Sequence, residues 1–269
     1  MASDLEIIAL SCLQAVLTME SEREFFIKAG KILPGLIERI GTRRNYNNRR
    51  RHLSQLMEQI RMRIASWLVF VLKEDPVYIV DSMPLPICRL ARAARCRICR
   101  DEAPTQPNKG YCASQMEYYF GFKFHAVCSL QGVFLSYAIS SGSMHDINAL
   151  SIVRDQFQDC TIIGDKAYIS AQWREDLFTY SNVQLEVPSR ANQRVQVVYS
   201  PENAKQRKRI ETNFSQLVCH LGIRKNYATS ACGLTTRIAA KMMAFTLFQY
   251  SNYQGKRHVG QIKGSKLAA

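Results

Sequence analysis

The chain has 269 residues, of which 47% are apolar, so it can build one sizeable core plus a smaller accessory domain, and disorder is excluded. Its net charge of +14 suits a polyanion, either nucleic acid or an anionic membrane surface. The longest apolar segments, 64–72 and 242–250, are shorter than the roughly 18 residues of a membrane-spanning helix, and the N-terminus is acidic, unlike a signal peptide. We therefore expect an intracellular protein that does not enter the membrane.

Residues 1–75 are predicted to form a helical, DNA-binding domain. Ser3 and Glu6 make a capping-box pattern at the start of a first helix. Its apolar residues recur at three- and four-residue steps: Leu5, Ile8, Cys12, Leu13, Val16 and Leu17. A second helical pattern carries Leu53, Leu56, Met57, Ile60, Ile64 and Trp67. Pro76 and the two acids before it break this helix, which places the domain boundary near residue 75.

Between these two helical patterns lies a dense run of basic and amide side chains, residues 43–52. Such a run at a helix junction suits contacts to DNA phosphates, and also contacts to base edges in the manner of helix-turn-helix proteins. The candidates are Arg43, Arg44, Arg49 and Arg50. A solvated charged helix face is the alternative interpretation.

Residues 76–252 change to short β-rich runs and are predicted to form an α/β domain. The expected elements are a strand at 77–80, a hairpin of 118–125 with 133–140, a helix from about 145, strands at 161–164 and 183–187, and a long helix from Pro201. This order predicts a mixed sheet with flanking helices, similar to a ribonuclease-H-like core. Residues 82–117 are expected to be a basic insertion or loop, and residues 253–269 a basic tail.

Three acids stand in suggestive places within this domain. Asp81 and Asp165 each end an apolar, strand-like run, and Glu211 borders the apolar stripe of the long basic helix. Two divalent ions about 4 Å apart on a phosphodiester need carboxylates from several elements, because hard cations prefer oxygen ligands. The alternative for each acid is structural, since an aspartate after a strand often caps the next helix and a helical glutamate is usually solvated.

Five motifs occur in the order found in one family of enzymes. They are Val80-Asp81-Ser82-Met83-Pro84-Leu85-Pro86, Gly121-Phe122-Lys123-Phe124-His125, Gly142-Ser143-Met144-His145-Asp146, Ile163-Gly164-Asp165-Lys166-Ala167-Tyr168 and Arg209-Ile210-Glu211-Thr212-Asn213-Phe214. Over nearly its whole length the chain resembles DDE transposases, which have a ribonuclease-H-like catalytic domain. It is most similar to bacterial insertion-sequence transposases of the insertion-sequence 982 family.

The resemblance implies that Asp81, Asp165 and Glu211 are the catalytic acids and hold Mg²⁺ or Mn²⁺, and that the N-terminal helices help to recognise the element's ends. Neighbouring motif positions that could orient phosphate or a DNA strand are Lys123, His125, His145 and Lys166, with a structural role as the alternative for each. Arg207 and Lys208 are further DNA-binding candidates. Of the Tyr, Arg, Glu, Lys signature of related enzymes, only Arg207 and Glu211 match, because Ala204 and Val218 occupy the outer positions. Related proteins tend to begin before Ser3, so a truncated or unusually short N-terminus is expected.

The implied function is cleavage and strand transfer of DNA, with element ends and target DNA as partners, in the bacterial cytoplasm at the nucleoid. Action on two DNA ends favours a homodimer. One alternative is a DNA-binding regulator or inactive transposase remnant, and another is a metal-dependent nuclease that never joins strands.

Nine cysteines, an odd number lying partly in apolar runs, indicate reduced and mostly buried thiols. Cys96 and Cys99 form a C-x2-C pair, and with Cys88 and Cys112 they could make a four-cysteine zinc site. The outer spacing lacks a second paired hook, so incidental cysteines are the default interpretation.

Overall fold

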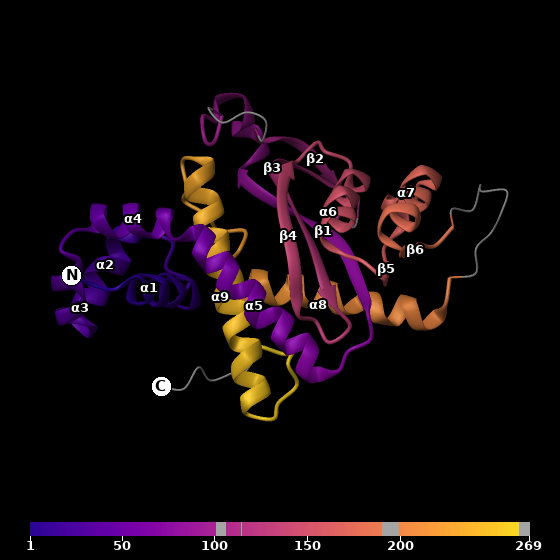
Figure 1. Cartoon of the computed structure of the whole chain (residues 1–269). Coiled ribbons are helices and arrows are strands. Elements are labelled where there is room, and N and C mark those ends of the chain that lie inside the picture. Colours follow the sequence, from indigo (N-terminus) through magenta and orange to yellow (C-terminus); the bar gives the residue numbers. More distant parts are fainter. Residues whose placement is uncertain (101–105, 114, 190–198, 264–269) are drawn as a thin grey trace.

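The computed structural model describes residues 1–100, 106–113, 115–189 and 199–263. A group of N-terminal helices lies to one side, two long helices cross the middle of the molecule, and a mixed sheet lies on the other side with further helices around it (Figure 1). Within the described ranges, none of the helices combines the length and the apolar character needed to cross a membrane.

The N-terminal region is helical, as predicted. Its helices are α1 (Asp4–Val16), α2 (Glu22–Ile32), α3 (Pro34–Ile40), α4 (Arg43–His52) and α5 (Ser54–Leu72). The predicted capping box is present: Ser3 Oγ accepts the Glu6 N–H at 3.2 Å, and the Glu6 carboxylate accepts the Ser3 N–H at 2.7 Å. Two of the four N–H groups that a helix start leaves without a partner are thereby satisfied reciprocally.

The apolar stripe predicted for α1 is partly wrong. Ile8 and Cys12 are buried, but Leu5, Leu13 and Leu17 are exposed. The helix packs on two sides, because Ile8 and Cys12 join the main core while Ile7 and Leu10 join a separate cluster with α2 and α4. Two buried faces blur the single stripe on which the periodicity argument depends.

The sheet contains β1 (Val77–Cys88), β2 (Asn108–Cys112), β3 (Glu117–Ser129), β4 (Phe134–Ser141), β5 (Cys160–Ile163) and β6 (Val183–Glu186). Strand order is β2-β3-β1-β5-β6, and β4 also pairs with β3. β3 is antiparallel to β1, β2 and β4, whereas β1, β5 and β6 run parallel to one another. The predicted mixed sheet, its hairpin and its ribonuclease-H-like character are confirmed.

The region expected to be a loop, residues 82–117, departs from the prediction. β1 does not end at Asp81 but continues to Cys88, paired with β3 along this length. A short 3₁₀ helix, η1 (Leu90–Arg95), and β2 follow, and β2 pairs with the first half of β3. Residues 101–105 and 114 of the expected insertion lie outside the described residues.

The remaining helical elements are η2 (Asp146–Ala149), α6 (Leu150–Gln156), η3 (Lys166–Tyr168), α7 (Ala171–Ser181), α8 (Pro201–Leu221) and α9 (Ala231–Gln254). The helices predicted from about 145 and from Pro201 are confirmed. α7 and α9 were not predicted from the sequence. α9, which follows α8, is the longer of these last two helices. Residues 264–269 of the expected basic tail lie outside the described residues.

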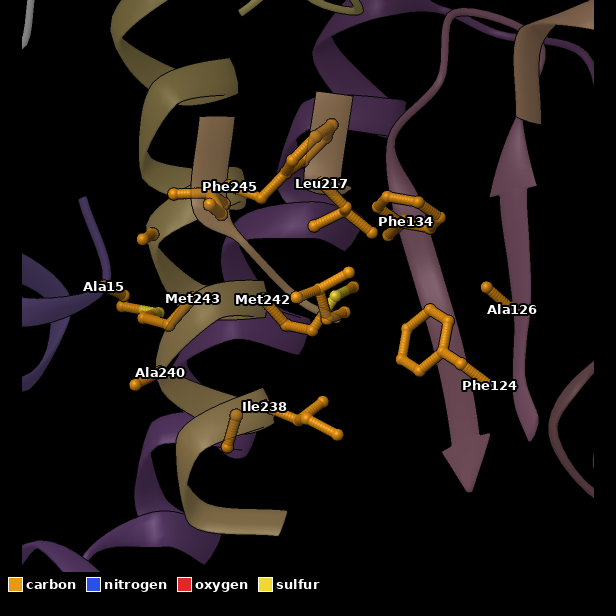
Figure 2. Close-up of a cluster of buried hydrophobic side chains, with 14 of the residues drawn as sticks. Ala15, Phe124, Ala126, Phe134, Leu217, Ile238, Ala240, Met242, Met243 and Phe245 are labelled. Carbon is orange, nitrogen blue, oxygen red and sulfur yellow. The ribbon is translucent and has the colours of Figure 1, made fainter. Parts of the chain in front are cut away.

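The main core joins the N-terminal helices to the sheet. Figure 2 shows α9 contributing Ile238, Met242, Met243 and Phe245, which lie between Ala15 of α1 on one side and Phe124 and Phe134 of the sheet on the other. Leu217 of α8 packs in the same cluster. Helices change to strands between Leu72 and Val77, close to the expected boundary, yet α1 and α5 share this core with the sheet.

A buried arginine fastens α5 to β4. Arg61 is fully buried and donates to the main-chain oxygens of Phe134 at 2.5 Å and Leu135 at 3.0 Å. Its charge is balanced by Glu58, one turn earlier on α5, at 2.6 Å. A buried guanidinium with all these partners fixes how the helix crosses the sheet.

Replacing Arg61 by alanine is expected to lower the free energy of unfolding by about 3 kcal/mol, because a buried ion pair is broken and two buried carbonyls lose their donor. Urea titration followed by circular dichroism measures the change. Arg63→Ala, at an exposed position on the same helix, should cost less than about 0.5 kcal/mol. Equal effects of the two substitutions would contradict the role given to Arg61.

Candidate active site

The parallel pairing of β1 with β5 brings two of the predicted acids together. Tyr78 is paired with Ile162 and Ile79 with Ile163. The pairing ends there, and Asp81 and Asp165 follow Ile79 and Ile163 two residues later, so an extension of this register places them opposite each other; the Asp165 charge acts on Asp81 accordingly. Neighbouring strands lie about 5 Å apart, and residues in register point to the same face. Asp81 and Asp165 are thus adjacent at the end of the parallel ladder, one inside β1 and one just beyond β5.

Local hydrogen bonds orient both carboxylates. Asp81 Oδ1 accepts the Ser82 N–H at 2.8 Å, and Asp165 Oδ1 accepts the Ala167 N–H at 2.8 Å, where Asp165 caps η3. The capping role that we weighed for Asp165 is therefore present. It does not exclude a ligand role, because a carboxylate has a second oxygen.

Both carboxylates have a raised pKa. Burial raises the pKa of Asp81 to about 7, and the nearby charges of Asp165 and Asp146 raise it further against the Ser82 N–H and Arg207. Burial is also the main cause that raises the pKa of Asp165, opposed by the Ala167 N–H and Arg207. Two half-buried carboxylates that repel each other form a site at which a cation is favoured.

Asp146 is a third acid at this site, and sequence reasoning did not assign it a role. It accepts hydrogen bonds from Ser82 Oγ at 2.6 Å and Lys123 Nζ at 3.1 Å, and its charge acts on both Asp81 and Asp165. Its motif, Gly142-Ser143-Met144-His145-Asp146, was the available signal.

His125 is buried and Lys123 is largely buried, and both lie next to Asp146. The His125 side chain is 2% exposed and its Nε2 is 2.7 Å from Ser140 Oγ. Burial is the main cause that lowers the pKa of His125 to about 4, so the ring is neutral near pH 7. Lys123, 12% exposed, binds Asp146 and the Met144 carbonyl. These contacts make both residues supports of the site in this structure, not groups that reach DNA phosphates.

Glu211 is on α8, whose predicted stripe of Ile210, Phe214, Leu217 and Leu221 is buried as expected. The Glu211 side chain is half exposed and binds Arg207 at 3.1 Å, one turn earlier. Burial lowers the pKa of Arg207. The hydrogen bond to Glu211 and the charges of Asp81 and Asp165 raise it by more, so the net shift is upward. Arg207 therefore lies among all three predicted acids and balances their charge.

The donors of this site fit a hard divalent cation. Asp81 and Asp165 offer neighbouring carboxylate oxygens, which Mg²⁺ and Mn²⁺ prefer. Their raised pKa values reflect a charge that a cation would stabilise. In the part of the chain that the structure describes, no three His, Cys, Asp or Glu side chains lie close enough to share one ion. Glu211, the third predicted ligand, is bonded to Arg207 and does not lie with Asp81 and Asp165 in one group of possible metal ligands.

The candidate DNA-binding residues differ in exposure. Arg43, Arg44, Lys166 and Lys208 are exposed, and Arg207 is partly exposed. Arg49 is tied to Asp4 and to the Ala2 carbonyl. Arg50 is 4% exposed, bonded to Gln14 at 2.6 Å and near Glu22 at 3.8 Å. Arg50 is therefore buried and lines a cavity, unlike the exposed Arg43 and Arg44.

The nine cysteines, all among the described residues, form no disulfide with one another, and most are at least partly buried. Cys99 belongs to the main core. Cys88, at the end of β1, lies beside Cys96, and burial followed by contact with Cys96 raises the pKa of Cys88. The four cysteines that we considered for zinc thus include one packed into the apolar interior.

Comparison with known proteins identifies the class of this fold and site. Residues 72–247, nearly two thirds of the chain, match the family model described as the transposase DDE domain, and the chain belongs to this family. Searches among curated proteins and among solved structures found no match. The matched segment includes Asp81, Asp165 and Glu211.

The raised pKa of Asp81 predicts how stability depends on pH. An aspartate whose pKa rises from 3.8 in the unfolded chain to about 7 in the folded one costs stability as pH increases through this window. Without metal, Asp81→Asn should therefore gain on the order of 1 to 3 kcal/mol relative to wild type between pH 4 and pH 8. Denaturant titrations at both pH values measure the gain.

The control for this prediction is Asp155→Asn, because the Asp155 side chain is 61% exposed and lies away from the acid pair. We expect no comparable gain for that variant. An Asp81→Asn difference that is the same at pH 4 and pH 8 would contradict the cost that burial imposes on the ionised Asp81 carboxylate.

Proposed function

We propose that this protein is a bacterial insertion-sequence transposase, of the insertion-sequence 982 kind, that cuts the ends of its element and joins them to target DNA. The observation that carries the proposal is the register-matched pair of raised-pKa carboxylates, Asp81 and Asp165, inside a transposase DDE domain. Asp81, Asp165 and Glu211 are proposed as the metal-holding catalytic acids.

The ionised carboxylates of Asp81, Asp165 and Glu211 would hold Mg²⁺ or Mn²⁺, and no side chain is needed as a nucleophile. When bound, two such ions supply an activated water or 3′-OH and stabilise the leaving oxygen of a phosphodiester. Asp146 and Lys123 keep the floor of the site fixed through their contacts with Ser82 and Met144. Arg207 releases Glu211 and becomes available to a DNA phosphate next to the acids.

DNA binding is proposed for the exposed basic side chains of both regions. Arg43 and Arg44 project from α4, and Lys166 and Lys208 flank the acids on η3 and α8. The five arginines of the expected insertion are exposed as well: Arg89, Arg92, Arg95, Arg97 and Arg100. Phosphate contacts of this kind position DNA without reading its sequence.

The organisation we propose has a helical DNA-binding region at 1–75, the catalytic domain at 76–252 and a basic tail at 253–269. The protein would act at the nucleoid in the cytoplasm. Because one element has two ends, a homodimer with one active site for each end is part of the proposal.

The purified protein should nick DNA that carries the element's terminal inverted repeats only when Mg²⁺ or Mn²⁺ is present. Asp81→Asn, Asp165→Asn and Glu211→Gln should each reduce nicking to background while the circular dichroism spectrum is kept, because each removes a metal-holding carboxylate. Asp155→Asn and Glu202→Gln, the latter at an exposed position on α8, are matched controls that should cut normally. Wild-type cleavage by any of the three acid variants would remove that residue from the proposed site.

Strand transfer separates the proposal from its two rivals. Pre-nicked element ends mixed with a target plasmid should give joined products. Cleavage without joined products would indicate a nuclease that does not transpose. DNA binding with neither product would indicate a regulator or an inactive remnant.

A further inference from the structure

A cationic cavity lies away from the acid pair, where the N-terminal helices meet α9. It measures about 90 Å³ and is bounded by the first turn of α2, the last turn of α4 and the first turns of α9. Figure 1 shows the end of α4 approaching α9. Three of its lining side chains are arginines, Arg50, Arg51 and Arg237, against a single carboxylate, Glu22.

The contacts leave positive charge uncompensated at this cavity. Glu22 binds Arg237 at 2.7 Å and is 3.8 Å from Arg50, whose nearest partner, the Gln14 amide oxygen at 2.6 Å, is neutral. Behind them Lys241 binds Glu20 at 2.5 Å. Among the described residues, Arg51 has no carboxylate within ion-pair distance. Four cations therefore face two carboxylates, which leaves two positive charges in excess.

Burial makes this excess costly. Arg50 and Arg237 are 4% and 8% exposed, so solvent screens them poorly. Burial lowers the pKa of Arg237, and repulsion from Arg50 lowers it further against the attraction of Glu22. Burial likewise lowers the pKa of Lys241; the charge and hydrogen bond of Glu20 oppose this shift, and repulsion from Arg237 and Arg50 adds to it. A bound anion would offset the repulsion among these groups.

The shape of the cavity suits a small anion. Its volume is well above the roughly 10–15 Å³ that one water molecule needs on this measure. Arg51 is exposed at the rim, and its Nη2 lies 3.9 Å from where a β carbon on Gly233 would be, over the first turn of α9. Two buried guanidinium groups at the floor and a third at the rim form a receptor of the kind that phosphate favours.

We propose that this cavity binds one phosphate group, held by Arg50, Arg51 and Arg237, and that a backbone phosphate of DNA supplies it. The choice of DNA as the source rests on the proposed function, whereas phosphate binding itself does not. One bound phosphate would fasten DNA to α4 and α9 together. Because α9 packs on the sheet that carries the acids, this contact would set how DNA on the N-terminal helices approaches the active site.

The first test uses inorganic phosphate, with wild type, Arg51→Ala and the control Arg63→Ala. Both arginines are exposed, so neither substitution removes a core contact. At constant ionic strength, calorimetric titration should give phosphate binding to wild type and Arg63→Ala, and about tenfold weaker binding to Arg51→Ala, as expected when a charged hydrogen-bond partner is lost. Equal phosphate affinity in wild type and Arg51→Ala, or no binding to either, overturns the site.

The second test uses a generic duplex without metal, over a range of salt concentrations. If DNA supplies the phosphate, Arg51→Ala should weaken binding and reduce the slope of log affinity against log salt by about one, while Arg63→Ala leaves the slope unchanged. An unchanged slope in Arg51→Ala, with its phosphate affinity reduced, would overturn DNA as the source. Absence of nicking by a protein that still passes both tests would instead contradict the proposed catalysis and leave the cavity assignment supported.

Discussion

The parallel pairing of β1 with β5 is the constraint on which the candidate site depends. Because Ile79 is in register with Ile163, Asp81 and Asp165 follow at equal distances and must lie side by side. Their mutual repulsion and burial are intrinsic costs of the fold, visible as raised pKa values. A site that destabilises its own apo form is one that a cation can stabilise, and such costs are common where an enzyme does chemistry.

The rest of the molecule keeps this edge of the sheet in place and connects it to the basic N-terminal helices. α9 runs through the core between α1 and the strands, so the predicted DNA-binding region is packed against the catalytic sheet and is not a tethered module. Charged groups link the parts as well: Arg61 ties α5 to β4, and Arg237 and Lys241 tie α9 to Glu20 and Glu22. If DNA binds to these helices, as proposed, a continuous packed structure relates it to the acids.

Strong local patterns made much of the fold predictable, and the failures have physical causes. Pro84 and Pro86 make residues 82–88 unlike a strand in sequence. β1 nevertheless continues here, paired with β3 alone, because its pairing with β5 ends at Ile79. A proline costs little where one edge of the strand is unpaired, since its missing N–H is not needed there. α9 has buried residues all around its axis and therefore lacks a stripe. Of the site, the Asp81 and Asp165 pair followed from their strands, but the contacts of Asp146 and the capture of Glu211 by Arg207 depend on tertiary structure.

The central claim is that Asp81 and Asp165 together hold a divalent cation. Anomalous X-ray diffraction from crystals grown with Mn²⁺ tests it most directly, because the signal locates the metal independently of activity. We predict a manganese peak coordinated by one carboxylate oxygen from Asp81 and one from Asp165, and its loss in crystals of Asp81→Asn. Manganese bound only elsewhere on the protein, or a peak that persists unchanged in the variant, would contradict the claim.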